Sequence, residues 1–287
     1  MISRKQFNKE IDLIIANAIR EDVGDGDHSS LACIPSTAKG KAKLLVKDEG
    51  VIAGVTFAKQ VFAYIDKDLI VKTLIEDGSK VSYGDIVFYV EGSSQSILKS
   101  ERLVLNAMQR MSAIATKTKS FVDLLKGTGT KILDTRKTTP GIRAIEKWAV
   151  KIGGGENHRF ALYDMIMLKD NHIDFAGGIT KAIDLTKQYL KYTNRDLKII
   201  VEARNLKEIE EILQNNGIYR ILIDNFNYED TKKAVKLIGN KCLTESSGGI
   251  NEQTILQYAE CGVDYISSGA LTHSVYNMDL SLKGNLI

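Results

Sequence analysis

The second half of the chain alternates short apolar segments with helical patterns, and this alternation constrains the fold more than any other feature. Each apolar segment ends in polar residues; the six are KILDT, MIMLKDN, KIIVEA, RILIDN, KCLTESS and DYISSG, which begin at residues 131, 165, 198, 220, 241 and 264. Apolar residues recur at helical spacing between them, over 179–192, 205–216, 228–238 and 251–261. Repeating βα units predict a parallel sheet that is buried on both faces.

Two architectures can be built from such units, a (β/α) barrel and an open doubly wound sheet. The barrel is favoured because polar residues stand at the carboxyl end of every apolar segment, where the active face of a barrel lies. Six strands are clear in the pattern. A seventh is expected near NHRFALYD, residues 157–164.

The first half of the chain has a different pattern of apolar and polar residues. Residues 40–92 contain short alternating apolar and polar runs that are broken by glycine turns, with one helical pattern at 56–66, which indicates an α+β unit. The N-terminal stretch through Gly24 predicts an amphipathic helix rather than a signal peptide. A long helical pattern over 99–127 leads into the second half, with a break expected near Ser112.

Length and composition exclude several classes. A chain of 287 residues is long enough for one barrel or two domains. A net charge of +3 is too small to indicate a nucleic-acid partner, and no apolar run approaches the ~20 residues that span a membrane. Cys33, Cys242 and Cys261 form no CxxC pair, so we interpret them as reduced residues in or near the core of a cytoplasmic protein, with a reactive thiol as the alternative.

Cations gather after the first apolar segment of the second half. The stretches DTRKTTPGIR (134–143) and GGGENHR (153–159) place basic residues among glycines, threonines and a proline; these residues are Arg136, Lys137, Arg143, His158 and Arg159. Lys169 follows the second apolar segment, and Glu202 and Asp224 lie at the ends of the third and fourth apolar segments. Such a loop composition indicates an anion site. The alternative is a set of helix caps and salt bridges without a ligand.

Two glycine loops follow the last two strand patterns, ESSGGI and ISSGAL. Glycines let backbone N–H groups approach an anion, and barrels commonly hold phosphate after their last strands. Glu202 and Asp224 suit ribose hydroxyls or Mg²⁺, which prefers oxygen ligands. The cations exceed what one monophosphate needs, so phosphoribosyl diphosphate with an acidic acceptor fits the pattern.

The stretch DTRKTTPGIRAIEKWAVKIGGGENHRFALYDMIMLKDNHI closely resembles the quinolinate phosphoribosyltransferase family, the carboxylating nicotinate-nucleotide pyrophosphorylases. The resemblance extends to REDVGDGDHSS, ERLVLNAMQRMSAIAT and ESSGGINEQTILQYAECGVDYISSGALTHS, so it covers nearly the whole chain in order. It implies an α/β protein with an N-terminal α+β sandwich domain (1–112 plus 274–287) and an incomplete, seven-stranded α/β barrel (113–273). It also implies a homodimer or a higher even oligomer.

The resemblance further implies a reaction and its residues. Quinolinate and phosphoribosyl diphosphate would give nicotinate mononucleotide, carbon dioxide and diphosphate, with Mg²⁺ held at Glu202 and Asp224. Lys137, Lys169, Glu202 and Asp224 would be catalytic. The residues implied to bind substrate are Arg102 from the neighbouring subunit, Thr135, Arg136, Lys137, His158, Arg159, Lys169, Glu202, Asp224, Ser247, Gly248, Gly249, Ser268, Gly269 and Ala270.

Two rival functions remain at this point. A molybdenum-transport-associated relative shares the fold, and a non-catalytic nucleotide-binding protein could have kept it. The second predicts the loss of a charged site residue, and none is lost. Three other histidines are assigned to loops: His28 to a polar turn with caps rather than a metal site, and His172 and His273 to capping or orienting loops.

Overall fold

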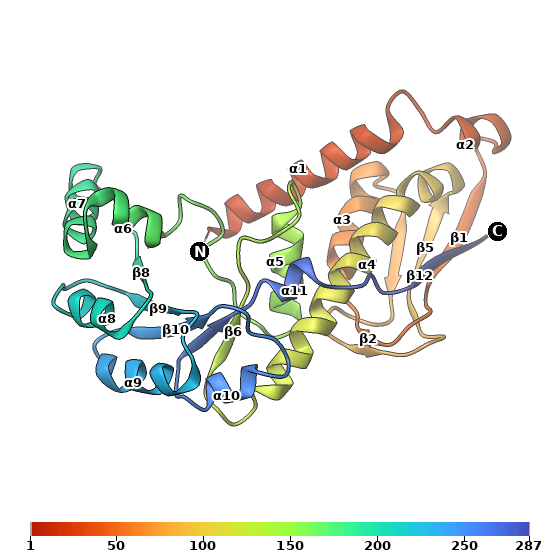
Figure 1. Ribbon diagram of the computed structural model, residues 1–287. Helices are drawn as coiled ribbons and strands as arrows, with labels where there is room; N and C mark the ends of the chain where they lie inside the picture. Colours follow the sequence, from red (N-terminus) through yellow and green to blue (C-terminus); the bar gives the residue numbers. More distant parts are fainter. Residues whose placement is uncertain (1, 287) are drawn as a thin grey trace. The chain divides into compact units, whose positions relative to one another are not determined.

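The computed structural model describes residues 2–286, and the chain divides into two compact units (Figure 1). The parallel-sheet unit contains Ser120–Lys137 and Gly155–Ala270, together with Ile2. The antiparallel-sheet unit contains Ser3–Lys119, Thr138–Gly154 and the residues from Leu271 onward. This division differs from the boundaries predicted at 112 and 273, because residues 113–119 and 138–154 group with the antiparallel-sheet unit.

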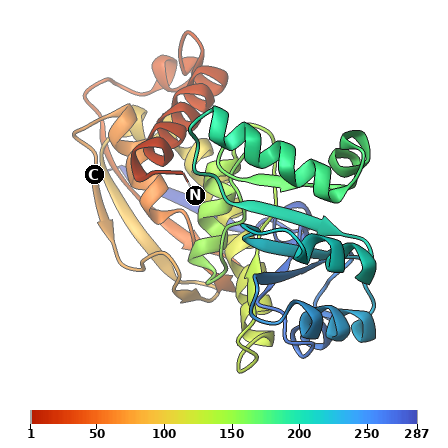
Figure 2. The same cartoon turned by 90° about the vertical axis from the view of Figure 1, so that its left-hand side faces the viewer.

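All six predicted strands of the parallel-sheet unit are present. They are β6 (Lys131–Leu133), β7 (Ile166–Leu168), β8 (Ile199–Ala203), β9 (Arg220–Asp224), β10 (Leu243–Ser247) and β11 (Tyr265–Ser267). Their order is β6-β11-β10-β9-β8-β7, and every pair is parallel. The teal and blue strands of this sheet can be followed in Figures 1 and 2. The order runs in one direction and joins the last strand to the first, as in a (β/α) barrel. A doubly wound sheet reverses its strand order, so that alternative is wrong.

The seventh strand expected at 157–164 is not formed. Glu156, just before it, makes a single parallel bridge to Leu133. Beyond that bridge, the backbone N–H groups of residues 158, 160 and 161 donate to the side-chain carboxylates of Asp134 and Asp164. Because side chains take up these donors, the segment does not use them to pair as a strand.

The helices of this unit largely match the helical patterns. They are α6 (Asp170–Ala176), α7 (Ile179–Tyr192), α8 (Leu206–Leu213), α9 (Tyr228–Ile238) and α10 (Ile255–Ala259). The short helix α11 (Ala270–His273) follows β11 and lies mostly in the antiparallel-sheet unit. Asn205 and Asn227 cap α8 and α9 by accepting backbone N–H bonds, as N-cap asparagines do. Helix α10 is shorter than predicted because residues 251–254 form a hydrogen-bonded turn around Asn251.

The antiparallel-sheet unit is the predicted α+β unit. Strands β1 (Lys39–Val46), β3 (Ile70–Thr73), β5 (Ile86–Ser93) and β12 (Leu280–Leu286) form a sheet in the order β12-β1-β5-β3. The short strands β2 (Gly50–Val51) and β4 (Lys80–Val81) pair separately. Alternate residues of β1 are buried, and helix α3 (Val55–Ile65) contacts the sheet, where the Phe62 and Phe88 rings meet edge to face at 5.8 Å.

Four further helices complete the described chain: α1 (Arg4–Val23), α2 (His28–Cys33), α4 (Ser94–Leu124) and α5 (Arg143–Ile152). The break expected near Ser112 is wrong, because α4 runs through it without interruption. The Ser112 hydroxyl accepts a bond from the N–H of Ala53 at 2.9 Å and contacts its carbonyl at 3.2 Å. The serine therefore ties the loop after β2 to α4.

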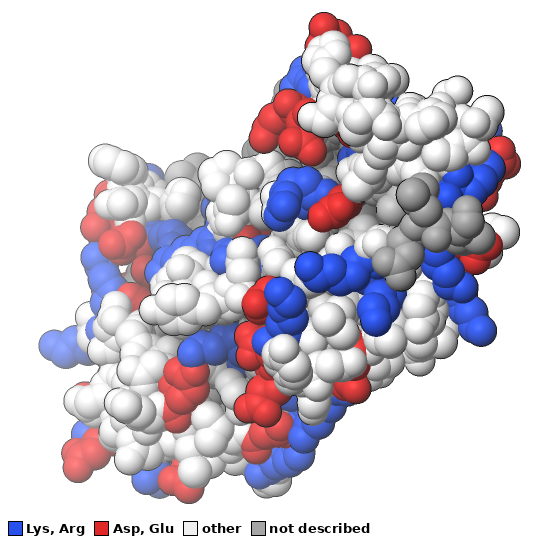
Figure 3. Space-filling view, turned by 90° about the vertical axis from the view of Figure 1, so that its right-hand side faces the viewer, with Lys and Arg blue, Asp and Glu red and all other residues white. Residues whose placement is uncertain are grey.

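The three cysteines are free, but they are not all in the core. Cys261 is buried and Cys242 is half-buried, whereas Cys33 is exposed, so the expectation of a core or near-core position is wrong for Cys33. On the face shown in Figure 3, basic and acidic side chains are interspersed. Within residues 2–286, no helix combines the length and apolar character that crossing a membrane requires.

Candidate active site

The parallel-sheet unit contains every predicted site residue except Arg102. Parallel strands present their carboxyl ends at one edge of a sheet, so the loops that follow them share that edge. The residues stand at the ends of successive strands: Thr135, Arg136 and Lys137 after β6; His158 and Arg159 after the Glu156 bridge; Lys169 after β7; Glu202 in β8; Asp224 in β9; Ser247, Gly248 and Gly249 at β10; and Ser268, Gly269 and Ala270 after β11.

Two carboxylates and a lysine meet at the ends of β7, β8 and β9. Lys169 Nζ lies 4.0 Å from Glu202 Oε2. Burial raises the pKa of Glu202, and the negative charge of Asp224 raises it further, while Lys169 opposes the shift. Burial also raises the pKa of Asp224, although a 2.6 Å bond from Asn225 lowers it. The fold thus holds two carboxylates close together against their repulsion, a place for a cation or for developing positive charge.

Lys169 is the N-cap residue of α6, where its backbone N–H donates to His172 Nδ1 at 3.1 Å. His172 therefore orients the loop that presents Lys169, as predicted. The Lys169 side chain itself is about half exposed.

His158 and Arg159 are held from several sides. The Asp134 carboxylate, which is fully buried, accepts the backbone N–H of His158 at 2.8 Å. His158 Nδ1 accepts the backbone N–H of Arg159 at 2.6 Å, and one guanidinium nitrogen of Arg159 donates to the Met165 carbonyl at 3.1 Å. Arg159 is almost buried, and its pKa is lowered by this burial and by the like charge of Arg136.

A buried ion pair lies behind this segment and was not assigned a role from the sequence. Glu245 in β10 is fully buried, and its Oε2 lies 2.6 Å from Arg220 Nη1 and 3.3 Å from His158 Nε2. Burial alone would raise the pKa of Glu245, but His158 and Arg220 lower it to about 2. Glu245 is therefore ionised at neutral pH. The only sequence signal for it was a charged residue inside an apolar strand pattern.

The two glycine loops are joined by their own side chains. The Ser268 hydroxyl donates to the Ile250 carbonyl at 3.1 Å, and the Ser268 N–H donates to Leu133. Gly248 has φ 104°, and a Cβ there would lie 2.1 Å from Asn225 Oδ1. Packing against Asn225 thus explains this glycine without a ligand, whereas Gly249 (φ 61°) faces open space.

The remaining predicted residues take simpler positions. Thr135 Oγ1 accepts the N–H of Lys137 at 3.0 Å, which shapes the turn after β6, and the Arg136 and Lys137 side chains are exposed. Arg102 lies in the antiparallel-sheet unit and is exposed. It stands within α4, inside the helical pattern predicted over 99–127.

The turn predicted around His28 is confirmed. Asp27 caps α2 by accepting bonds from the Ser30 N–H at 3.1 Å and from its hydroxyl at 2.5 Å. His28 is the first residue of α2, with its Nε2 3.4 Å from an exposed Asp25 carboxylate. His273 ends α11 and bonds Ser274 Oγ through Nδ1 at 2.7 Å.

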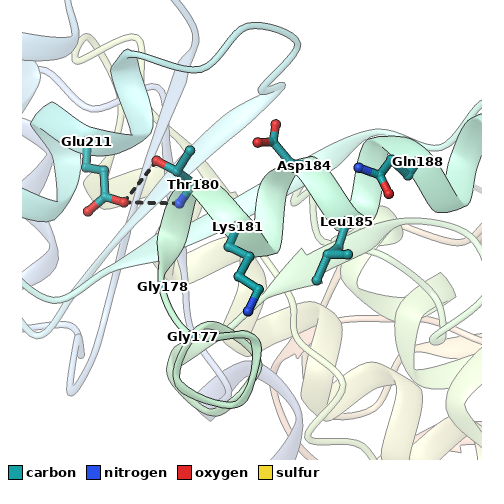
Figure 4. Close-up of a pocket in the computed structure, with 8 residues that line it drawn as sticks. All are labelled: Gly177, Gly178, Thr180, Lys181, Asp184, Leu185, Gln188 and Glu211. Atoms are coloured by element: carbon teal, nitrogen blue, oxygen red, sulfur yellow. Dashed lines mark hydrogen bonds between the residues drawn. The ribbon is translucent and has the colours of Figure 1, made fainter.

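A cavity of about 450 Å³ lies beside the start of α7 and contains none of the predicted site residues (Figure 4). The figure shows Glu211 reaching from α8 to the first turn of α7, where it accepts bonds from the Thr180 N–H (3.1 Å) and hydroxyl (3.0 Å). This carboxylate already occupies the helix N-terminus, where an anion is favoured.

The fold and the site together define an α/β enzyme of the kind that acts on anionic substrates at the carboxyl edge of a parallel sheet. Comparison with known families agrees. The family model "Quinolinate phosphoribosyl transferase, N-terminal domain" matches residues 27–112, and its C-terminal counterpart matches residues 114–283. The chain belongs to the quinolinate phosphoribosyltransferase family.

Individual relatives agree with this assignment. The chloroplastic nicotinate-nucleotide pyrophosphorylase [carboxylating] of Oryza sativa subsp. japonica is 43% identical, over 96% of this chain and 77% of that protein. A probable enzyme of the same name from Bacillus subtilis (strain 168) is 38% identical, over 93% of this chain and 90% of that protein. The crystal structure of NadC from Streptococcus pyogenes is 37% identical and superposes with a TM-score of 0.89, over 100% of this chain and 99% of that one.

Proposed function

We propose that this protein transfers the phosphoribosyl group of phosphoribosyl diphosphate to quinolinate. The products are nicotinate mononucleotide, carbon dioxide and diphosphate, as in the biosynthesis of NAD. Membership of the family supports this reaction. The structural observation that carries it is the placement of the nearly buried Arg159 close enough to Arg136 for that like charge to lower the pKa of Arg159.

A nearly buried guanidinium with a second, exposed guanidinium beside it favours an anionic partner. Quinolinate supplies two carboxylates on adjacent ring carbons, and guanidinium groups bind carboxylates through paired, charge-assisted hydrogen bonds. We assign Arg136 and Arg159 to these carboxylates. The Asp134 contact and the Met165 contact fix the backbone and the side chain of this segment before the acceptor arrives, which lowers the entropy lost on binding.

In the transfer step the pyridine nitrogen displaces diphosphate from the anomeric carbon of the ribose, through a transition state with positive charge on the sugar. Glu202 and Asp224 stabilise that charge because the fold already holds both carboxylates in place. Lys137 and Lys169 balance the negative charge of the leaving diphosphate. The chain thus contributes orientation and electrostatic stabilisation.

Loss of carbon dioxide follows from the transfer itself. Once the ring nitrogen carries the ribose it is positively charged, so it accepts the electron pair that the adjacent carboxylate leaves behind. A proton then replaces the lost carboxylate on the ring. The arginines hold the other carboxylate, which remains in the product.

The carboxylate pair also fits Mg²⁺. Within the described residues no group of three or more His, Cys, Asp or Glu side chains forms a metal site, so the protein alone does not make a cage. Mg²⁺ is typically held by one or two carboxylates together with substrate phosphates, and Glu202 and Asp224 match that arrangement. When bound, the ion would neutralise part of the diphosphate charge.

We further propose a homodimer in which Arg102 serves the site of the partner subunit. Its exposed place on α4 supports this role, since the side chain can reach a second molecule. A cytoplasmic location stays a prediction from the unpaired cysteines. The related Oryza sativa protein is named chloroplastic, and one from Nicotiana glauca is named mitochondrial.

The test is turnover by the purified protein with Mg²⁺ and phosphoribosyl diphosphate. Quinolinate should give nicotinate mononucleotide, identified by mass, and one carbon dioxide per product, measured from quinolinate labelled in the departing carboxyl. Nicotinate, which lacks that carboxylate, should not react. Equal turnover of nicotinate would refute the assignment, and binding of both substrates without product would favour the non-catalytic alternative. Absence of both binding and turnover would favour the molybdenum-transport-associated alternative.

A further inference from the structure

Glu245 is a buried carboxylate that the proposed reaction does not use, although it lies against a residue of the candidate site. It is fully buried in the strand that leads to the Ser247–Gly249 loop, and Arg220 is 95% buried beside it. Burying an ion pair costs solvation that the pairing only partly returns, so such a pair is weak evidence for a stabilising role. Its contact with His158 gives it another role.

The hydrogen bonds of His158 determine where its ring proton lies. Nδ1 accepts the Arg159 N–H at 2.6 Å, and a ring nitrogen that accepts a hydrogen bond carries no proton of its own. The proton is therefore on Nε2, which lies 3.3 Å from Glu245 Oε2 in an electrostatic contact rather than an aligned hydrogen bond. A carboxylate favours this tautomer because it attracts the N–H dipole and repels a bare nitrogen lone pair.

The same ring connects Glu245 to the site. Asp134 fixes the His158 backbone on the β6 side, and Glu245 faces its ring from β10. With the ring fixed, Nδ1 holds the backbone N–H of Arg159, whose side chain is one of the two close guanidiniums of the acceptor site. Arg220 completes the chain of contacts by holding Glu245 at 2.6 Å.

We propose that Glu245 is a positioning residue for the acceptor: it keeps His158 in the Nε2–H tautomer and thereby fixes Arg159 at the carboxylate-binding site. This rests on the proposed function. In this proposal His158 acts by positioning Arg159, and its imidazole does not need to contact the substrate. It also predicts that loss of Glu245 weakens the use of quinolinate and not the use of phosphoribosyl diphosphate.

The first experiment measures the tautomer in the wild-type protein, without substrate. Nitrogen-15 NMR of histidine-labelled protein separates protonated from bare ring nitrogens, and His158 is assigned by the signals lost in His158→Gln. We expect a protonated Nε2 and a bare Nδ1. A protonated Nδ1 overturns the proposal whatever the variants do.

The second experiment is a cycle of Glu245→Gln, Arg220→Gln and the double variant. Glu245→Gln leaves Arg220 buried without its counter-charge and should lower the melting temperature, whereas the double variant removes both charges and should recover much of that loss. For both proteins that lack the carboxylate, we expect a ten- to hundredfold fall in kcat/KM for quinolinate, roughly the cost of a misplaced binding group. The KM for phosphoribosyl diphosphate should stay within about twofold of wild type, because the lost contacts would serve the binding of quinolinate and not that of phosphoribosyl diphosphate.

The outcomes separate the possibilities. If the double variant regains both stability and quinolinate use, Glu245 serves the fold alone and the proposal fails. A rise in the KM for phosphoribosyl diphosphate instead would assign Glu245 to the neighbouring glycine loop and also overturn it. Wild-type turnover of quinolinate tests the proposed function separately, and the NMR result stands without any turnover.

Discussion

A single methyl group added at Gly248 tests how the two strand-end loops fit together. In Gly248→Ala the new Cβ would lie 2.1 Å from Asn225 Oδ1, 2.7 Å from its Cγ and 2.9 Å from its backbone nitrogen. The φ of 104° is also one that L side chains rarely adopt. Backbone strain of about 1–3 kcal/mol adds to an overpacking cost of similar size, so we expect a loss of about 2–6 kcal/mol.

Gly249→Ala is the matched control. Gly249 has φ 61°, and a Cβ there would meet nothing within 4 Å. Only the left-handed conformation is penalised, by about 1–2 kcal/mol. The difference between the two variants therefore reports the contact with Asn225 together with the less favourable φ at position 248.

A second substitution separates the clash from the backbone strain. Asn225→Gly in the Gly248→Ala background removes the Oδ1 and Cγ atoms, and glycine accepts the φ of 57° found at position 225. The contact with the backbone nitrogen and the strain at 248 remain, so recovery should be partial, with a coupling energy of about 1–3 kcal/mol.

Urea unfolding is the assay, followed by far-ultraviolet circular dichroism. The single tryptophan, Trp148, belongs to the antiparallel-sheet unit, so its fluorescence follows that unit separately. The reasoning is refuted if Gly248→Ala is no more destabilised than Gly249→Ala, or if Asn225→Gly restores nothing.

Two further predictions concern the charged residues of the site. Burial and the charge of Asp224 raise the pKa of Glu202 in the folded protein above its value in the unfolded chain. The ionised Glu202 therefore lowers the free energy of unfolding as the pH rises above the unfolded pKa. Glu202→Gln should raise the melting temperature of the ligand-free protein at pH 7, with a gain that shrinks toward pH 4, and it should abolish turnover. A lower melting temperature at pH 7 would contradict the assigned repulsion. Arg102→Ala and Lys169→Ala should each be nearly inactive, but unfolded and re-formed together in equal amounts they should recover about a quarter of wild-type activity, because half of the dimers are mixed and one of their two sites is complete. Mixed dimers confirmed by differential tags without any recovery would rule out the shared site.

The strands and most helices were predictable because local signals define them. Helices α7 and α9 have the predicted bounds, since a Gly pair precedes one and Asn227 caps the other. The break predicted at Ser112 is wrong because the prediction considered only neighbouring residues. In the structure the Ser112 hydroxyl accepts a hydrogen bond from the N–H of Ala53, which is far away in the sequence, and the helix continues.

The positions of the candidate site residues at strand ends were predictable, but the contacts among them were not. Residues at the carboxyl ends of parallel strands lie at the same edge of the sheet whatever the details of side-chain packing, so the sequence motifs were enough to place them there. The Glu245–Arg220 pair depends on strand register: Arg220 is opposite Leu243 in the sheet, and its side chain reaches two residues further along β10. No periodicity in either strand specifies that reach. The same holds for the fit of Gly248 against Asn225, which is a contact between two adjacent loops.

The strand order also governs when the protein can fold during synthesis. β6 pairs with β11, Lys131 opposite Tyr265, and β1 pairs with β12, Lys39–Val46 lying beside the last described strand. At about 5–20 residues per second the ribosome needs roughly 7–27 seconds to pass from Lys131 to Tyr265. Until then β6 has no partner strand, and its length of three residues limits the template it offers to other nascent chains. A chain that stops before β11 would leave both units unfinished at once.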